Sequence, residues 1–330
     1  MKWVKIMGSK VKTIGVLTSG GDAPGMNAAV RAVVRAAIAD GNRVLGIRRG
    51  YNGLINGDMI EMNLRSVSDI INRGGTILYT ARCPEFRGEE GILKGKQTCI
   101  DAGIEGVVVI GGDGSFRGAR DLSLAGIPCV GVPGTIDNDI PCSEYTIGYD
   151  TAMNTAMEMV DRLRDTSQSH DRCSVVEVMG RRCGCIALNT GIACGATSII
   201  IPEKDFDLDR DIIARMMYTQ KSGKKHYIII VAEGVGGVYE LASEIEKKTG
   251  IETRATILGH VQRGGSPTVT DRVIASQMGV HAVNLLSKGI GNRVVAVKEN
   301  KIVDFDIYEA LNITRPFDEE LFNIAQKISI

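Results

Sequence analysis

The sequence predicts an α/β protein built from two lobes, each with a mostly parallel sheet and flanking helices. Two observations lead to this prediction. Short apolar runs alternate with glycine-rich turns and helical stretches, which is the pattern of βα units on parallel sheets. The chain has 330 residues, which is long for a single hydrophobic core and suits two. The expected architecture is therefore two Rossmann-like lobes.

The elements expected in the first lobe follow the order strand, turn, helix. The chain is predicted to open with a strand at 13–18, a turn at 19–25 and a helix at 26–40 that ends at Gly41. One more strand, at 293–297, indicates that late sequence completes this lobe. The other apolar runs of this lobe predict strands at 43–47, 106–110 and 128–132.

A separate group of apolar runs predicts the second lobe. A long helix at 151–164, with Met153, Met157 and Val160 on one face, is expected to precede its sheet. Its strands are predicted at 174–178, 197–201 and 227–231. The expected lobe bounds are 1–148 plus about 262–312 for the first lobe, and 149–261 plus about 313–330 for the second.

Charge and composition exclude several classes of protein. Lys and Arg total 39, and so do Asp and Glu, so the zero net charge argues against a general nucleic-acid binder. No apolar stretch reaches the length of a membrane span, and the first seven residues are too short for a secretory signal. Among the cysteines, the close pair Cys183 and Cys185 lacks the second Cys or His pair of a metal site. We therefore expect a cytoplasmic protein with reduced thiols and no membrane or nucleic-acid partner.

Two glycine-rich turns follow predicted strands and precede predicted helices. The first, at 20–25, offers free backbone amides and the positive end of a helix dipole to an anion, although it matches neither a Walker loop nor a dinucleotide fingerprint. The second, at 111–115, places Asp113 among glycines, where its carboxylate could hold the Mg²⁺ of a nucleotide. The alternative is that Asp113 only caps the next helix.

A third turn, at 133–139, carries a hydroxyl and two carboxylates. Thr135 follows a strand, and Asp137 and Asp139 flank an asparagine. A pair of carboxylates so close together favours a metal site or a general base, whereas an isolated sequence of this kind is usually a plain turn. The three turns together predict phosphoryl chemistry.

Arginines recur at the predicted strand ends and indicate a phosphorylated ligand. Arginine binds phosphate oxygens in a bidentate manner, although for any one arginine a surface salt bridge is the simpler interpretation. Glu233 could accept protons from sugar hydroxyls or could cap a helix. Arg31 and Arg35 lie four residues apart and share one helix face, which could face an external anion or only solvent. The arginines at strand ends are Arg172, Arg181, Arg254 and Arg263, with His260 beside the last.

Six motifs resemble those of bacterial ATP-dependent 6-phosphofructokinase, in the same order, from about Lys12 to Phe317. The segments PGTIDND and LGHVQRGGSP are highly specific together, and residues 1–11 precede the usual start as an apparent extension. The other four are LTSGGDAPGMNAAVR, INRGGTILYTAR, VVIGGDGS and SVVEVMGR.

The resemblance implies Mg²⁺-dependent phosphoryl transfer from ATP to the 1-hydroxyl of fructose 6-phosphate, the committed step of glycolysis. Asp137 resembles the base, Asp113 the Mg²⁺ ligand, Asp139 a support for the metal and Thr135 a contact to the transferred group. Arg82 would stabilise charge on that group. The ATP-site matches are Gly21, Tyr51, Arg82, Cys83, Gly112, Asp113, Gly114 and Ser115. The matching catalytic positions also include Gly21 and Arg181.

The sugar-phosphate site of the family matches a second set of positions. Arg172 and Arg254 match residues that the family lends from a neighbouring subunit, so the resemblance implies a homotetramer. The matching substrate positions are Thr135, Ile136, Asp137, Arg172, Met179, Gly180, Arg181, Glu233, Arg254, His260, Val261, Gln262 and Arg263.

Two glycines favour ATP over pyrophosphate as the donor. Relatives that use pyrophosphate carry Asp where Gly114 stands and Lys where Gly134 stands, so glycine at both positions leaves room for the α-phosphate of a nucleotide. A pyrophosphate-dependent phosphofructokinase and a sensor of sugar phosphates or nucleotides that lacks turnover stay as alternatives. A lipid or NAD kinase shares only the loop around Asp113.

The family's effector site, which binds ADP or phosphoenolpyruvate, matches less well. Leu64 stands where an arginine is usual, although Arg65 is adjacent, and Thr197 replaces a glutamate. Ser222 replaces a lysine, unless a one-residue insertion near 205–221 lies elsewhere and Lys221 takes that place. We therefore expect a weak or altered response to both effectors. The matching cations are Arg31, Arg35, Arg65, Arg164, Lys224 and Lys225.

Overall fold

A computed structural model describes residues 13–329, so the expected N-terminal extension at 1–11 lies outside the described residues. The described chain forms two compact units, and each contains several segments of the sequence. The first holds the residues up to 136, then 140–150 and 263–315, and the second holds 137–139, 151–262 and the residues from 316. The segment 137–139 thus belongs to the second unit, although the residues before and after it, up to 136 and from 140 to 150, belong to the first. Which lobe holds which ligand stays a prediction.

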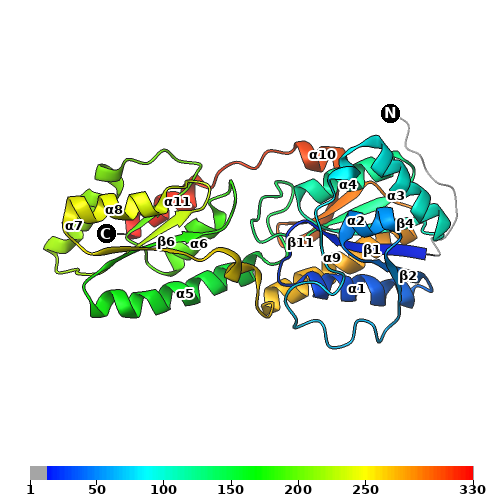
Figure 1. Ribbon diagram of the computed structural model, residues 1–330, viewed down its shortest axis with the longest axis horizontal. Coiled ribbons are helices and arrows are strands. Elements are labelled where there is room, and N and C mark those ends of the chain that lie inside the picture. Colours follow the sequence, from blue (N-terminus) through cyan, green and yellow to red (C-terminus); the bar gives the residue numbers. More distant parts are fainter. Residues whose placement is uncertain (1–12, 330) are drawn as a thin grey trace. The chain divides into compact units, whose positions relative to one another are not determined.

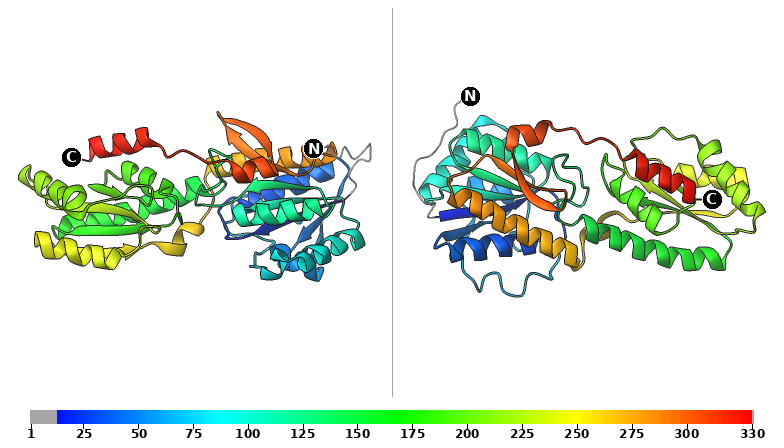
Figure 2. Two further views of the ribbon diagram at one scale, coloured as in Figure 1. Left: turned by 90° about the horizontal axis from the view of Figure 1, so that it is seen from above. Right: turned by 180° about the vertical axis from the view of Figure 1, so that it is seen from behind.

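The first unit is built on a seven-stranded sheet in the order β11-β10-β5-β4-β1-β2-β3. Its five inner strands are parallel, and late sequence enters through β10, which pairs with β5. The outermost strands, β3 and β11, are antiparallel to their neighbours, and the hairpin of β10 and β11 is drawn in orange in Figure 2. The strands are β1 (Thr13–Ser19), β2 (Arg43–Ile47), β3 (Met59–Met62), β4 (Gly106–Gly111), β5 (Cys129–Pro133), β10 (Arg293–Lys298) and β11 (Lys301–Asp306).

Helices cover this sheet and bury its apolar strands. Every residue of β1, β4 and β5 is buried, as expected for parallel strands covered on both faces. Helices α1 and α9 pack against each other and lie side by side in Figure 1. The helices are α1 (Met26–Ala39), α2 (Gly50–Asn56), α3 (Glu89–Asp101), α4 (Asp113–Leu124), α9 (Val269–Ser287) and α10 (Ile307–Asn312), with a 3₁₀ turn at Pro84–Arg87.

The second unit is built on a four-stranded parallel sheet in the order β7-β8-β6-β9. Its core gathers apolar residues of β6 and β8 with those of the covering helices, and the C-terminal helix α11 packs on α6. The strands are β6 (Cys173–Val178), β7 (Ser198–Ile200), β8 (Tyr227–Ala232) and β9 (Thr253–Ile257). The helices are α5 (Tyr149–Ser169), α6 (Cys185–Ala193), α7 (Ala214–Lys221), α8 (Val238–Thr249) and α11 (Glu319–Ile328), with a π-helical turn at Asp209–Ile213 and a 3₁₀ turn at Gly259–Arg263.

The α/β prediction is confirmed, and the differences lie at the sheet edges. The sequence did not predict β3, β9 or β11, all of which are edge strands. Edge strands bury little, and β9, with the sequence Thr-Arg-Ala-Thr-Ile, buries only its first residue, so no apolar run marks it. Among residues 13–329, the helices lack the combination of length and apolar character that a membrane span requires.

Candidate active site

Three turns meet at one edge of the first sheet because their strands are neighbours. In the order β5-β4-β1, Ser19 pairs with Gly111 and Gly111 pairs with Pro133, so the three strands end at the same level. The carboxyl edge of a parallel sheet is where α/β proteins bind their ligands. The turns at 20–25 and 111–115 and the first part of the third turn, at 133–136, therefore lie side by side within the first unit.

The first turn is shaped by glycines and by an arginine from late sequence. Gly20 and Gly25 adopt φ angles of +89° and +105°, which side chains rarely adopt. Arg263 Nη1 donates to the carbonyl of Asp22 at 3.1 Å, and a Cβ atom on Gly21 would overlap that guanidinium. A side chain at position 21 would therefore have to displace the end of Arg263. The turn opens α1, whose first amides suit an anion.

The second turn places a carboxylate at the start of a helix. Asp113 begins α4, where it pairs with Arg117 one helical turn later (Nε to Oδ2, 2.9 Å), and both side chains are about half exposed. A Cβ atom on Gly111 would overlap the carbonyl of Ser19, so only glycine lets the two strand ends approach. A Cβ atom on Gly114 would meet nothing within 4 Å, so the space beside it is open. The sequence had not singled out Arg117.

Tyr51 supports the second turn from behind. Its side chain is buried, its hydroxyl donates to the carbonyl of Ser115 at 2.6 Å, and its ring stacks on Phe86 with 4.2 Å between centroids. Burial raises the pKa of Tyr51 well above its ordinary value, so the hydroxyl stays a donor. Its predicted contact with ATP stays a prediction, as do those of exposed Arg82 and half-buried Cys83.

The third turn carries the two carboxylates. Thr135 is buried, and its carbonyl accepts a hydrogen bond of 2.6 Å from the hydroxyl of Thr146. Asp137 is 3% exposed, with Arg181 Nε at 3.9 Å from its Oδ2. The same guanidinium lies 3.3 Å from Asp139, so Arg181 faces both carboxylates. The turn therefore presents a nearly buried carboxylate beside the positive charge of an exposed arginine.

A loop of the second unit holds the segment that contains Arg181. The Oε1 atom of Glu233 accepts from the backbone amides of Gly180 (3.2 Å) and Arg181 (2.6 Å). Buried Gln262 accepts from the amide of Met179 at 2.9 Å. Met179, Gly180, Arg181, Glu233 and Gln262 are thus brought together, and their binding of the sugar phosphate, which the family resemblance implies, stays a prediction.

Glu177 also belongs to this neighbourhood, and the sequence analysis missed it. It lies on β6, where burial, and then the charge of Glu233, raise the pKa of its carboxyl. The sequence signal was present, because Glu177 is the one charged residue in the run Cys173–Val178.

Two arginines predicted to bind the substrate, Arg172 and Arg254, lie at the amino ends of the strands of the second sheet, whereas Arg181 lies beyond a carboxyl end. Arg172 directly precedes β6 and Arg254 lies near the start of β9, whereas Met179 and Glu233 follow the carboxyl ends of β6 and β8. Six-residue strands separate the two edges by roughly 20 Å. Arg172 and Arg254 both bind Glu252, at 2.6 and 2.5 Å. One chain therefore does not bring them to Arg181.

The predicted effector cations are divided between the units. Arg31, Arg35 and Arg65 belong to the first, whereas Arg164 and the two lysines belong to the second. There Lys224 donates to the hydroxyl of Thr197 at 3.1 Å. Burial, and then the charge of Arg164, lower the pKa of Lys224.

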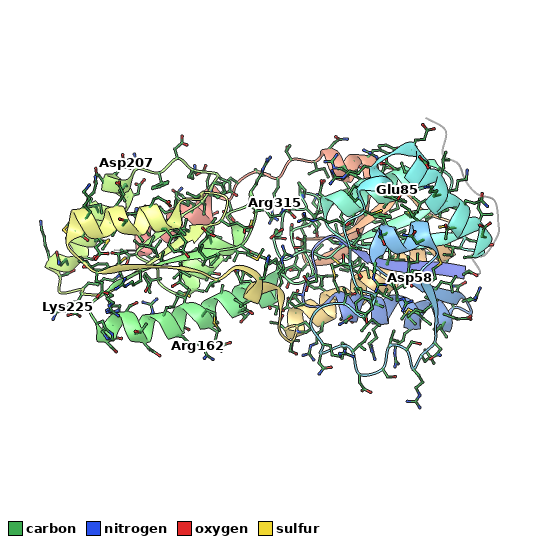
Figure 3. The ribbon with its side chains drawn as sticks, viewed as in Figure 1. Asp58, Glu85, Arg162, Asp207, Lys225 and Arg315 are labelled. Atoms are coloured by element: carbon green, nitrogen blue, oxygen red, sulfur yellow. The ribbon has the colours of Figure 1, made fainter. Side chains whose placement is uncertain are left out.

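Lys225, labelled in Figure 3, is 72% exposed and lies 3.8 Å from Asp171. It thus pairs with a neighbouring surface carboxylate.

Known proteins resemble the chain over almost its whole length. Residues 13–286 match the protein family described as Phosphofructokinase. The chain is 59% identical over 320 residues to an ATP-dependent 6-phosphofructokinase from Alkaliphilus metalliredigens (strain QYMF), which covers 97% of this chain and 100% of that protein. An ATP-dependent 6-phosphofructokinase from Clostridium botulinum (strain Hall) is 59% identical over 319 residues, with the same coverage.

A solved structure of phosphofructokinase from Saccharomyces cerevisiae has the same fold. It matches 97% of this chain at 36% identity with a TM-score of 0.86, and the match spans 48% of the yeast chain. Fold, sequence identity and coverage agree with the motif resemblance. The chain belongs to the phosphofructokinase family.

Proposed function

We propose that this chain transfers the γ-phosphoryl group of ATP to the 1-hydroxyl of fructose 6-phosphate, giving fructose 1,6-bisphosphate and ADP. The observation that carries the proposal is the nearly buried carboxylate of Asp137 beside Arg181, on a turn that begins at Gly134, whose amide donates to Gly111 in the strand end before Asp113. A base for the attacking hydroxyl and a cradle for phosphates are the two parts that phosphoryl transfer needs. The names of the relatives point to the same reaction.

Each group has a role in this reaction. Asp137 takes the proton of the 1-hydroxyl, the hydroxyl oxygen bonds to the γ-phosphorus, and the bond from phosphorus to the bridging oxygen breaks with its electron pair on ADP. Arg82 and the amide of Gly21 stabilise the charge on the transferred group, and Thr135 contacts it. Glu233, through the amides of Gly180 and Arg181, holds the loop that binds the sugar phosphate.

A magnesium ion would be held by Asp113, together with the phosphates. Among the described residues there is no cluster of three or more His, Cys, Asp or Glu that could hold a metal ion, which agrees with a cation carried chiefly by its nucleotide. The Asp113 carboxylate fits this use because it is half exposed beside the open space at Gly114. Bound there, Mg²⁺ would neutralise the charge of the β- and γ-phosphates.

ATP is the proposed donor because of Gly114. The open space beside it leaves room for an α-phosphate. Gly134 supports the proposal less directly, since a Cβ atom there would point at Ile110 Cγ2 (3.0 Å) and Met26 Cε (3.2 Å) in the core.

We also propose a homotetramer in which neighbouring subunits complete the sugar-phosphate site. Support comes from Arg172 and Arg254, which lie at the wrong edge of their own sheet to reach Arg181. A cytoplasmic location fits the substrates, and all eight cysteines are free, as is typical of a reducing compartment.

Weak or altered control by ADP and phosphoenolpyruvate is part of the same proposal. Exposed Leu64 offers no charge, and the buried hydroxyl of Thr197 accepts from Lys224 where a carboxylate would hold a metal. The π-helical turn at Asp209–Ile213 holds one extra residue per turn, so it is the natural place for the expected insertion. Because it precedes position 221, it favours Ser222 over Lys221 as the residue at the effector position.

Steady-state turnover tests the proposal. The protein is assayed with fructose 6-phosphate and either ATP or pyrophosphate, with and without Mg²⁺, ADP and phosphoenolpyruvate. We expect turnover with ATP and Mg²⁺ and small effector shifts. Turnover with pyrophosphate alone would reverse the donor assignment, binding without turnover would indicate a sensor, and strong effector shifts would contradict the proposed loss of control.

A further inference from the structure

A buried carboxylate outside the predicted site anchors a short loop of the first unit. Asp271 has no exposed surface and lies in the first turn of α9, which Thr268 caps by accepting from the amide of Asp271. Its Oδ1 atom accepts from the hydroxyl of Tyr145 at 2.8 Å and from the amide of Gly148 at 2.6 Å. Both donors belong to the loop between the third turn and α5. A buried charge is tolerated only when it is hydrogen-bonded, and the helix N-terminus stabilises it further.

One side of this loop is bonded to the strand end that carries Thr135. The hydroxyl of Thr146 donates to the carbonyl of Thr135 at 2.6 Å, and the amide of Ile147 donates to that of Pro133 at 2.9 Å. Asp137 follows Thr135 by two residues. The strand end that leads into the proposed base is therefore held through Thr146.

The other side of the loop packs against the first glycine-rich turn. A Cβ atom on Gly25 would lie 2.6 Å from Ile147 Cγ2, and one on Gly148 would lie 2.7 Å from the Cβ of Ala23. Both glycines are thus needed for this close approach. The loop at 145–148 therefore contacts both the first turn and the start of the third.

We propose that Asp271 is a positioning residue that sets the separation of these two turns through Tyr145, Gly148 and Thr146. The inference rests on the proposed function, because it assigns to this contact the spacing between the phosphate-binding turn and the strand end at 133–136 that leads into the base. Burial, and then the Asp271 carboxylate, raise the pKa of Tyr145, which keeps the phenol a donor to Asp271. A misplacement of about 1 Å between the reacting groups lowers the rate of the chemical step by up to about a hundredfold. The contacts that bind the two substrates are unchanged by it, so the affinity for each substrate should stay the same.

The variants Thr146→Val and Tyr145→Phe test the proposal with the full chain. Each removes one hydroxyl and keeps the side-chain shape. We expect kcat with ATP and fructose 6-phosphate to fall about 10- to 100-fold, with both KM values and the calorimetric Kd for ADP within about threefold of wild type. Asp271→Asn keeps the Oδ1 acceptor and should lose less activity than Asp271→Ala.

Asp304→Asn is the matched control. Asp304 is a partly buried carboxylate of the same unit that also contacts α9, through His281 at 2.8 Å, but it is bonded to none of the three turns. It should lower the melting temperature by a similar amount and leave kcat unchanged.

The outcomes separate the two proposals. Unchanged kcat in folded Thr146→Val and Tyr145→Phe, with an active wild type, would overturn the role of Asp271 alone. A loss of kcat that tracks the melting temperature and is equal in Asp304→Asn would also overturn it, because the effect would then be one of stability. An inactive wild type would refute the proposed function and this role together.

Discussion

Replacing Asp137 by serine distinguishes two roles of this residue, that of a general base and that of a group that only positions the substrate. The carboxylate is 3% exposed, and its Oδ2 lies 3.9 Å from Arg181 Nε. Serine removes the proton acceptor and leaves Arg181 its other partner, Asp139, at 3.3 Å. The loop that holds Arg181 is also fixed by Glu233 through backbone amides, so the substitution leaves it in place.

The expected magnitude follows from the role of the lost group. General-base catalysis contributes about 10²- to 10⁴-fold in rate, which corresponds to about 2.7 to 5.4 kcal/mol at 1.36 kcal/mol per tenfold. We expect kcat to fall by this factor. The KM for fructose 6-phosphate should stay within about threefold, because Arg181 and Glu233 keep their positions.

A coupled assay at saturating ATP and varied fructose 6-phosphate measures both quantities, with circular dichroism as the control for folding. If kcat and substrate affinity fall by the same factor, Asp137 positions the substrate and is not the base. A loss of less than tenfold in a folded variant would equally refute the reasoning, since no proton would then depend on this carboxylate.

Two further predictions concern stability. Gly118→Ala would place a methyl group 2.7 Å from the Tyr51 ring, so the free energy of unfolding measured with urea should fall by roughly 1–3 kcal/mol, whereas Gly114→Ala in the same helix, with open space around it, should cost nothing. Equal effects of the two changes would contradict the predicted clash. The second prediction concerns Asp304. Burial alone would raise the pKa of Asp304, but the bonds to His281 and Arg293 hold that pKa below its ordinary value. Its stabilisation is therefore present above about pH 4 and is lost as the pH falls through the lower folded value, so Asp304→Asn should destabilise by roughly 1–3 kcal/mol at pH 7 and not near pH 2. A pH-independent difference would refute the ionic origin.

The sequence alone determined the inner strands, the three turns and the family. Apolar runs that end in glycine mark buried parallel strands, because such strands bury both faces and their ligand turns need backbone without side chains. The late strand at β10 was predicted for the same reason. Local pattern also marked Asp113, Asp137 and Arg181 as chemical groups, since each follows a strand end.

Only the tertiary structure decided which distant groups meet. Arg263 lies against Gly21, Asp271 holds the loop at Tyr145, and Arg172 lies at the edge of its sheet away from Arg181. These relations depend on strand order and on contacts between residues more than a hundred positions apart, or on which end of a strand a residue occupies. The spacing of apolar residues along the chain predicts one helix or strand at a time, whereas contacts between distant residues are set by how these elements pack together. The residue types came from local pattern, and the spacing between the turns came from packing.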